Sequence, residues 1–372
     1  FGNGIVINNK RVAEVVHKFR PDILVFTDPF RSAAYLNLFD GLNCVSTWTY
    51  TNPDPKYMFF IESLIAEGKY SLQEPISTVT MLNYPGTIYP KDKGWTIMSP
   101  DILVETNWIN FSRRPAALSV YLSSDCDPFD TKENAGSEKI WEDNQREPYQ
   151  RYPASFEAFK KFCDEVVKPF GPMVNNLERT PRKVAILSSQ SSRIYSISPT
   201  YATYYENYKI YDFYILLQMN HIPADVVFDE TIQEYGLDDY DVLVMPNCET
   251  LLKSVYDKIL AFQQRGGLIV SDQYLRAPLK DVVRFDFDFT YRTRVSADAI
   301  ISNKTYAVWD DHLDIKSAEL KDVNGITALD DQQIMELYAQ KLNDGLNNLI
   351  QKNIQCSSKT ALVNMLQKGN AK

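Results

Sequence analysis

Short apolar runs alternate with polar and helical stretches along the first 177 residues of the chain. Continuous runs of this kind are typical of strands that are buried on both faces of a parallel sheet. Helical periodicity follows or separates them, beginning with a helix over Val12–Phe19 that Pro21 ends. The pattern predicts successive βα units, which make half of an eight-fold β/α barrel, with an open doubly wound sheet as the alternative. The predicted strands of this part are Asp22–Thr27, Leu42–Trp48, Val79–Leu82 and Leu118–Leu122.

The stretch from Ile76 to Ser124 shows this alternation in its fullest form. A strand is followed by a long loop that contains Trp95, then by a helix over Asp101–Ser112 and by another strand. Ser99 supplies a helix cap, and Pro100 suits the first helical position. In a β/α barrel the residues just after each strand form the active face, so candidate chemistry is sought there.

The alternation continues from residue 181 to residue 285 on a smaller scale. A short turn is predicted over Thr231–Tyr235, and Gly266-Gly267 closes an amphipathic helix in the manner of a C-cap. The expected fold of this part is flavodoxin-like. Its predicted strands are Lys183–Ser189, Ala224–Asp229, Tyr240–Pro246 and Leu268–Asp272, and its predicted long helices are Tyr201–Asn220 and Leu251–Arg265.

The pattern changes again after residue 285. Residues 286–295 alternate polar and apolar side chains and predict a strand, whereas Asp330–Ile350 is an amphipathic helix. We therefore expect an α/β protein of three regions. Residues 1–178 form a partial barrel, residues 181–285 a flavodoxin-like domain, and residues 286–372 a helix with the start of a small β domain.

Composition narrows the classes of function. The net charge is -9, with no long basic run, which makes nucleic acid and membranes poor partners. No apolar run approaches the ~20 residues that span a bilayer. Five cysteines and three histidines are scattered, so we expect no disulfide framework, metal site or cofactor, and any catalysis would use carboxylates. The sequence around Phe1 looks internal to a longer chain, and the compartment cannot be read from it.

The order of these motifs resembles the family 42 (GH42) β-galactosidases. The most similar stretch runs from Tyr240-Asp241-Val242-Leu243-Val244-Met245-Pro246 to Arg265-Gly266-Gly267-Leu268-Ile269-Val270. The resemblance implies a TIM barrel, of which this chain holds strands five to eight, then a glutamine-amidotransferase-like domain that assists trimerisation, then a small β domain. It also implies a nucleophilic Glu after strand seven and an acid/base Glu after strand four. Asn83 stands where the resemblance places the nucleophilic Glu. The fourth strand of the barrel, which the acid/base Glu would follow, is not among those predicted.

Two carboxylates and a set of aromatic and amide side chains are the candidate site residues. Asp28 and Asp125 follow the first and last predicted strands of the barrel part and are the candidate catalytic residues, although each also suits a loop or turn. Aromatic rings at strand ends can stack on sugars, or can simply pack long loops over the barrel. The candidate sugar-binding residues are Trp48, Tyr50, Asn83, Tyr84 and Trp95.

Two further residues are set aside. Glu105 lies within the predicted helix Asp101–Ser112, which a barrel places in its outer ring, so this side chain is expected to face solvent. Cys248 follows a predicted strand but lacks a neighbouring His and a glycine-flanked elbow, which favours an inert thiol over a nucleophile. The second domain is therefore predicted to be non-catalytic.

Three functions are consistent with these observations. The first is a carbohydrate-active protein resembling a β-galactosidase-type glycoside hydrolase, which binds a glycan at the barrel mouth and forms a homo-oligomer through the flavodoxin-like domain. The second is a catalytically silent glycan-binding or scaffold protein with the same fold. The third is an open α/β ligand-binding protein without a barrel.

Overall fold

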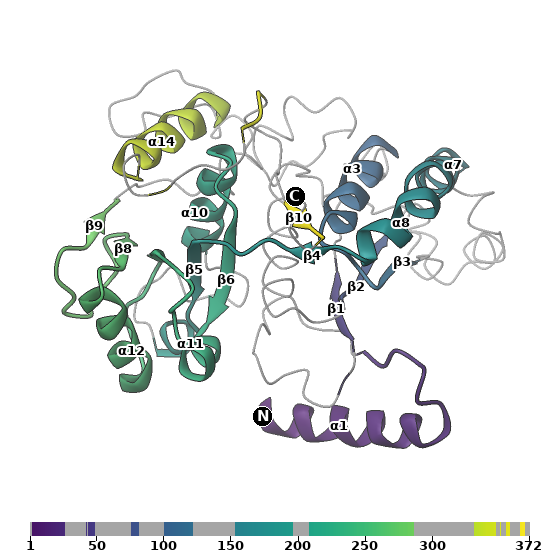
Figure 1. Ribbon diagram of the computed structural model, residues 1–372, viewed down its shortest axis with the longest axis horizontal. Helices are drawn as coiled ribbons and strands as arrows, with labels where there is room; N and C mark the ends of the chain where they lie inside the picture. The colour runs from purple at the N-terminus through teal and green to yellow at the C-terminus, as the bar shows by residue number, and fades with distance from the viewer. Residues whose placement is uncertain are drawn as a thin grey trace, which may run out of the picture.

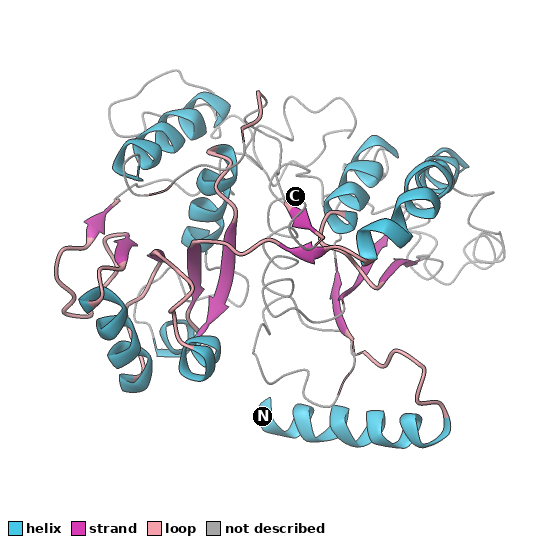
Figure 2. Ribbon diagram, viewed as in Figure 1, coloured by secondary structure: helices cyan, strands magenta, loops and turns pink. Residues whose placement is uncertain are grey.

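The computed structural model describes residues 2–26, 42, 44–48, 76–81, 100–121, 153–195, 208–285, 331–346, 350, 355–357 and 365–368. Two parallel sheets with flanking helices account for most of these residues (Figures 1 and 2). The protein is thus a mixed α/β protein, as predicted. The part-barrel and the domain boundaries stay predictions, because the segments that would complete them lie outside the described residues.

The first sheet has three parallel strands in the order β1–β2–β3. Helix α3 (Pro100–Phe111) connects β2 to β3 and packs against α7 (Pro153–Phe162). Three of the four strands predicted for this part are thereby confirmed, within a few residues at each end. The strands are β1 (Val45–Trp48), β2 (Ile76–Met81) and β3 (Ala117–Tyr121).

Helix α1 (Gly2–Phe19) includes the predicted helix and begins ten residues before it. The strand predicted to follow it is absent over Asp22–Phe26, which forms a turn and an irregular segment, while Thr27 lies outside the described residues. Arg20 pairs with Asp22, with 2.8 Å between Nη2 and Oδ2, and His17 Nε2 lies 3.1 Å from the carbonyl oxygen of Ile23. These contacts fold the segment back onto the helix end, so its apolar residues do not enter a strand.

A long helical run follows the first sheet. It comprises α7, a π-helical turn (Cys163–Val167) and α8 (Lys168–Asn175). The amide of Lys168 donates to the carbonyl oxygen of Cys163, five residues earlier, as a π-helix requires. Pro169 and Pro172 have no amide proton to donate, so the regular α pattern is interrupted just where this turn widens.

The second sheet has five parallel strands in the order β6–β5–β7–β8–β9. Numbered along the chain, this is the order 2-1-3-4-5 of flavodoxin-like doubly wound sheets. The first four strands coincide with the four predicted from continuous apolar runs. The strands are β5 (Val184–Ser188), β6 (Ala224–Phe228), β7 (Val242–Met245), β8 (Leu268–Ser271) and β9 (Val283–Arg284).

Alternate side chains of the second sheet enter two separate cores. Val184 and Ile186 of β5 pack with helix α10 (Tyr208–Met219) and helix α14 (Asp331–Leu346). Ala185 and Leu187 pack on the other face, with α11 (Asp229–Tyr235) and α12 (Lys253–Gln264). Figure 1 shows the two pairs of helices on opposite sides of the strands. Helix α9 (Gln190–Tyr195) follows β5 directly, and α11 replaces the turn predicted over Thr231–Tyr235.

The end of α12 shows why two glycines occur in succession. Gly266 has φ +98°, a left-handed conformation that disfavours other residues. The amide of Gly267 then donates to the carbonyl oxygen of Phe262 at 3.0 Å. A Cβ atom added at Gly267 would lie 2.4 Å from the Phe262 ring, so glycine is required for this close approach. The predicted C-cap is confirmed.

A short two-stranded sheet lies between the two larger ones. Strand β4 (Glu178–Arg179) pairs antiparallel with β10 (Leu366–Gln367), and the amide of Thr180 donates to the carbonyl oxygen of Met365 at 3.3 Å. The segment joining the two parallel sheets is therefore bonded to residues from the far end of the chain (Figure 1).

Candidate functional site

The carboxyl ends of β1, β2 and β3 lie at one edge of the first sheet. The register pairs Trp48 with Val79, and Met81 with Tyr121. Neighbouring strands lie about 4.8 Å apart, so the three chain segments that follow these strands start within roughly 10 Å of one another. We call this the first carboxyl edge. It is the edge where a parallel α/β sheet carries its ligands.

Most of the predicted site residues belong to the three segments that start at this edge. Trp48 is the last residue of β1 and is the one candidate that lies in the described chain. Asp28 precedes β1 in the chain. The candidates outside the described residues are Asp28, Tyr50, Asn83, Tyr84, Trp95 and Asp125.

Aromatic packing holds the helix behind the first sheet. The ring of Phe162 in α7 lies 5.5 Å from that of Trp108 and 6.3 Å from that of Phe111, measured between centroids and nearly perpendicular in both pairs. Edge-to-face pairs of this kind each contribute about 0.5–1.5 kcal/mol beyond the apolar area they bury. Glu105 is exposed on the same helix, as predicted.

Helix α3 and the turn that follows it carry a buried polar row that the sequence analysis missed. Asn107 is 1% exposed, and its Nδ2 donates to the carbonyl oxygen of Leu103 at 2.8 Å. Arg113, 2% exposed, donates to the hydroxyl of Tyr214 in α10 at 3.1 Å. The row consists of Thr106, Asn107, Asn110 and Arg113. Their spacing over two helical turns was visible in the sequence, but polar residues at that spacing are ordinarily solvated.

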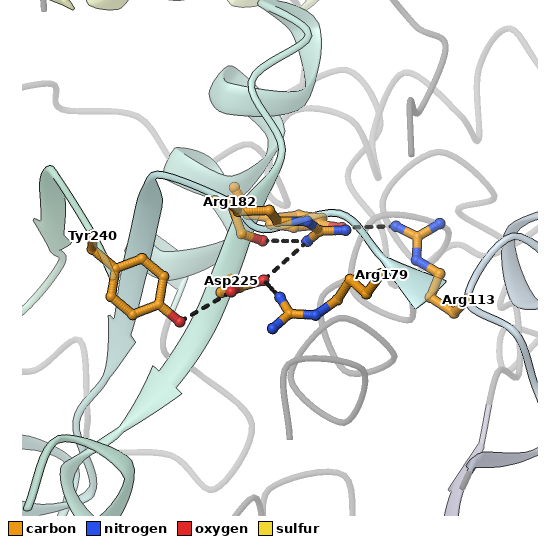
Figure 3. A network of polar contacts seen from close by, with 7 residues as sticks. Arg113, Arg179, Arg182, Asp225 and Tyr240 are labelled. Carbon is orange, nitrogen blue, oxygen red and sulfur yellow. Dashed lines mark hydrogen bonds and ion pairs between the residues drawn. The ribbon is translucent and has the colours of Figure 1, made fainter. Parts of the chain in front are cut away.

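An ion-pair network around Asp225 joins the linker, which is the segment around β4 that connects the two parallel sheets, to the second sheet (Figure 3). Asp225 lies in β6, is 2% exposed, and accepts hydrogen bonds from Arg179 and, at 3.0 Å, from the hydroxyl of Tyr240. Arg182 lies 3.5 Å from the same carboxylate and also donates to the carbonyl oxygen of Ala224 at 2.8 Å. Burial, reinforced by the Asp225 charge, raises the pKa of Tyr240, which therefore stays a hydrogen-bond donor. The network orients the two parts of the chain.

The carboxyl edge of the second sheet carries Cys248. This thiol is completely buried and donates to the carbonyl oxygen of Pro246 at 3.4 Å. Burial first, and then the nearby charges of Asp272 and Asp229, raise the pKa of Cys248 well above its usual value. A nucleophilic cysteine needs the opposite environment, so this geometry supports an inert thiol.

Polar residues near Cys248 form two hydrogen-bonded pairs that the sequence analysis did not single out. The amide of Ser191 donates to Asp229 Oδ2 at 2.7 Å, and the amide of Asn247 donates to Asp272 Oδ2 at 2.8 Å. Asn247 has φ +52°, a conformation that asparagine tolerates better than most residues. The signal was available, because Asp229 and Asp272 are each the last residue of a predicted strand. We call this set the second carboxyl edge.

Comparison with solved structures identifies the fold. The β-galactosidase of Rahnella sp. R3 matches with a TM-score of 0.51 and 16% identity, covering 72% of this chain and 40% of the other. The β-galactosidase of Bacillus circulans sp. alkalophilus matches with a TM-score of 0.52 and 15% identity, covering 73% and 39%. A catalytic mutant of a GH42 β-galactosidase from G. stearothermophilus gives 0.45 and 13%, covering 70% and 38%.

The predicted resemblance to β-galactosidases is thus confirmed at the level of fold by the first two of these structures. The chain spans about two fifths of the length of these structures. No protein-family model matches the sequence. No curated protein matches it either. Within the described residues, no helix is long and apolar enough to cross a membrane.

Proposed function

We propose that this chain belongs to a carbohydrate-active protein that binds a glycan at the first carboxyl edge. The observation that carries the proposal is the parallel register of β1, β2 and β3 in a fold shared with β-galactosidases. With this register, the three chain segments that follow the strands start at one edge, and these segments contain aromatic, amide and carboxylate side chains of the kinds that recognise sugars.

Hydrolysis at this edge would depend on carboxylates. A retaining glycosidase uses two carboxyl groups about 5–5.5 Å apart, one as acid/base and one as nucleophile. Asp125, in the segment that follows β3, is the candidate that belongs to this edge. Asp28 precedes β1, since the strand predicted before it is absent over Asp22–Phe26, and is the second candidate by residue type alone. The amide of Asn83 cannot attack an anomeric carbon but can bind a sugar hydroxyl. The proposed enzyme class is therefore an O-glycosyl hydrolase that uses these two aspartates.

Asn83 favours a second candidate function, a catalytically silent glycan-binding protein. It stands where the resemblance places the nucleophilic Glu, and no carboxylate occurs between Met81 and Gly86. A third candidate, an open α/β ligand-binding protein, draws on the second sheet, whose strand order is that of an open doubly wound fold. For oligomerisation we propose the second-sheet part as the contact surface between copies, tested by light scattering after gel filtration.

A glycoside screen combined with titration of galactosides separates these candidates. Turnover of aryl-β-galactosides that is lost in Asp28→Asn or Asp125→Asn supports the enzyme. Galactoside binding without turnover, weakened by Trp48→Ala, supports the silent protein. The matched control is Tyr235→Ala, which removes an aromatic side chain that is 67% exposed on α11. Neither turnover nor binding at the first carboxyl edge would contradict both and leave the third candidate.

A further inference from the structure

The second carboxyl edge lies where the connections of the five-stranded sheet change direction. The connection from β5 to β6 runs through α9 and α10, and that from β6 to β7 runs through α11 on the opposite face. Strands β6 and β7 lie on either side of β5. The loops after β5 and β7 leave in opposite directions, and the carboxyl ends of the strands at such a point are where doubly wound sheets bind their ligands.

One buried carboxylate at this edge is only half satisfied. Asp229 is 2% exposed, and its Oδ2 accepts from the Ser191 amide at 2.7 Å and from the Ser189 hydroxyl at 3.3 Å. Because these donors follow β5, the carboxyl group points from the end of β6 toward the centre of the edge. Its other oxygen, Oδ1, is buried without a hydrogen-bond partner. A buried acceptor in this state costs free energy that a donor from a ligand would recover.

The donors of the neighbouring loops are already engaged with one another. The hydroxyls of Ser191 and Ser192 both donate to the carbonyl oxygen of Thr250, at 3.1 Å and 2.5 Å, which ties the loop after β5 to the loop after β7. The groups left over are acceptors. Glu249 Oε1 after β7 and Gln273 Oε1 after β8 are buried oxygens without a hydrogen-bond partner, like Asp229 Oδ1.

The charge at this edge is predominantly negative. Asp229, Glu230, Glu249 and Asp272 all follow β6, β7 or β8 directly or within four residues. Burial and then the Asp229 charge raise the pKa of Glu230. The charges of Asp272 and Asp229 also help to raise the pKa of Cys248. Nearby, the guanidinium of Arg284 donates to the carbonyl oxygen of Asp272 at 2.6 Å rather than to a carboxylate. A ligand with donors and a positive charge would suit both the hydrogen bonding and the charge.

We propose that the second carboxyl edge binds a small organic cation, a primary ammonium compound, whose N–H groups donate to Asp229 Oδ1. Among the described residues, no three His, Cys, Asp or Glu side chains are arranged to hold a metal ion. An organic cation, which needs fewer acceptors than a metal ion, therefore suits this edge better. Glu249 and Gln273 offer further acceptors for a neighbouring hydroxyl or for the remaining N–H groups. The proposal does not depend on the glycan site.

Calorimetric titration with ethanolamine tests this site, with ethylene glycol as the neutral probe of the same size. We expect saturable millimolar binding of ethanolamine at constant ionic strength, and at least about tenfold weaker binding of ethylene glycol, because a charge-assisted hydrogen bond contributes about that factor. Asp229→Asn should weaken ethanolamine binding about tenfold, and Glu249→Gln should weaken it several-fold. Trp48→Ala should leave it unchanged, whatever the fate of glycan binding.

The control is Asp257→Asn, which removes the same charge from an exposed helix face where Asp257 pairs with Lys253 at 2.6 Å. Circular dichroism confirms that each variant is folded, and Glu249→Gln carries the test if Asp229→Asn is not. No saturable binding up to about 100 mM, or equal binding by the Asp229, Glu249 and Asp257 variants, would overturn the proposal. Binding of Ca²⁺ that the same variants abolish, without ethanolamine binding, would replace an organic ligand with a metal ion.

Discussion

At the scale of single residues, Asp225 makes the polar contacts that join the linker to the second sheet. Two arginines from residues 179–182 and one tyrosine hydroxyl converge on its carboxylate (Figure 3). The carboxylate is buried, so screening by solvent is weak and loss of the charge is not compensated by water. Of the polar groups described above, it is the one on which most charged partners converge.

Asp225→Ala should therefore lower the free energy of unfolding by about 3 kcal/mol, the lower end of the range for a broken buried ion pair. The lower end applies because the side chain of Arg179 is 14% exposed and keeps some contact with solvent. Chemical denaturation followed by circular dichroism measures the change. The exposed pair Lys253–Asp257 provides the comparison, since Asp257→Ala should change stability by no more than about 0.5 kcal/mol. Equal effects would show that the network contributes little.

Tyr240 makes a prediction about alkaline pH. Its pKa is raised in the folded protein, so the folded state keeps the phenolic proton when the unfolded chain begins to lose it near pH 10. The unfolded state then binds fewer protons than the folded state, and stability falls as the pH rises above about 10. Tyr240→Phe should flatten this fall in a series of melting temperatures between neutral and alkaline pH. Tyr195→Phe, at a position that is 65% exposed, should leave the curve unchanged.

At the scale of elements, helix ends and strand partners explain where sequence patterns succeed. The four long strands of the second sheet were predictable because continuous apolar runs ended at polar residues. The run Asp22–Phe26 is equally apolar, yet Leu24 and Phe26 are 40% and 45% exposed and enter no strand. Strand propensity acts only where a neighbouring strand is available.

Helix α11 was missed for a different reason. Its seven residues bury only Asp229 and Ile232, too few positions to show a helical period. Asp229 and Glu230 in its first turn favour the helix dipole, a signal that also suits a turn. The Arg113–Tyr214 and Arg179–Asp225 contacts join residues 101 and 46 positions apart, and no local pattern reveals such pairs. Of the candidate site, the sequence could supply residue types and strand ends but not side-chain placement.

Two glycines, one at the end of α12 and one in α14, should respond in opposite ways to substitution by alanine. Gly267→Ala should be clearly destabilising, by about 1–3 kcal/mol, since the new Cβ would overlap the Phe262 ring. Gly345→Ala in α14 meets only Val283, at 4.0 Å, and should be neutral or stabilising by up to about 1 kcal/mol because alanine favours helices. Thermal unfolding of both variants decides the matter. Adding Phe262→Leu to Gly267→Ala should recover part of the loss, and additive effects would contradict the overlap.

At the scale of the whole molecule, helix α14 adds residues beyond 285 to the core on the α10 face of the second sheet. Tyr338 and Leu342 are 1% exposed and pack with the α10 face of the sheet, and Asn220 Nδ2 donates to the carbonyl oxygen of Ala339 at 2.8 Å. A fragment of residues 181–285 would keep α10 on that face but would lack the part of the core that α14 contributes. A fragment of residues 181–350 would retain the helix.

We expect the longer fragment to melt cooperatively and the shorter one to melt at a lower temperature and to bind a dye for exposed apolar surface. In the full chain, Leu342→Ala should cost about 2–5 kcal/mol, as for other buried leucines. Differential scanning fluorimetry of the two fragments and of this variant makes the comparison. Identical melting of both fragments would show that α14 is dispensable for the core on the α10 face of the sheet.

The pairing of β4 with β10 brings together the two ends of the stretch of chain that lies between these strands. The amide of Thr180 and the carbonyl of Met365 are 3.3 Å apart, so a covalent bridge of two or three residues would suffice to join the chain there. The stretch that contains the second sheet thus begins and ends at neighbouring residues, as an inserted domain does. Such modules can be excised or exchanged while the host continues through the same β-pair, which makes this pair the natural point for building chimaeras.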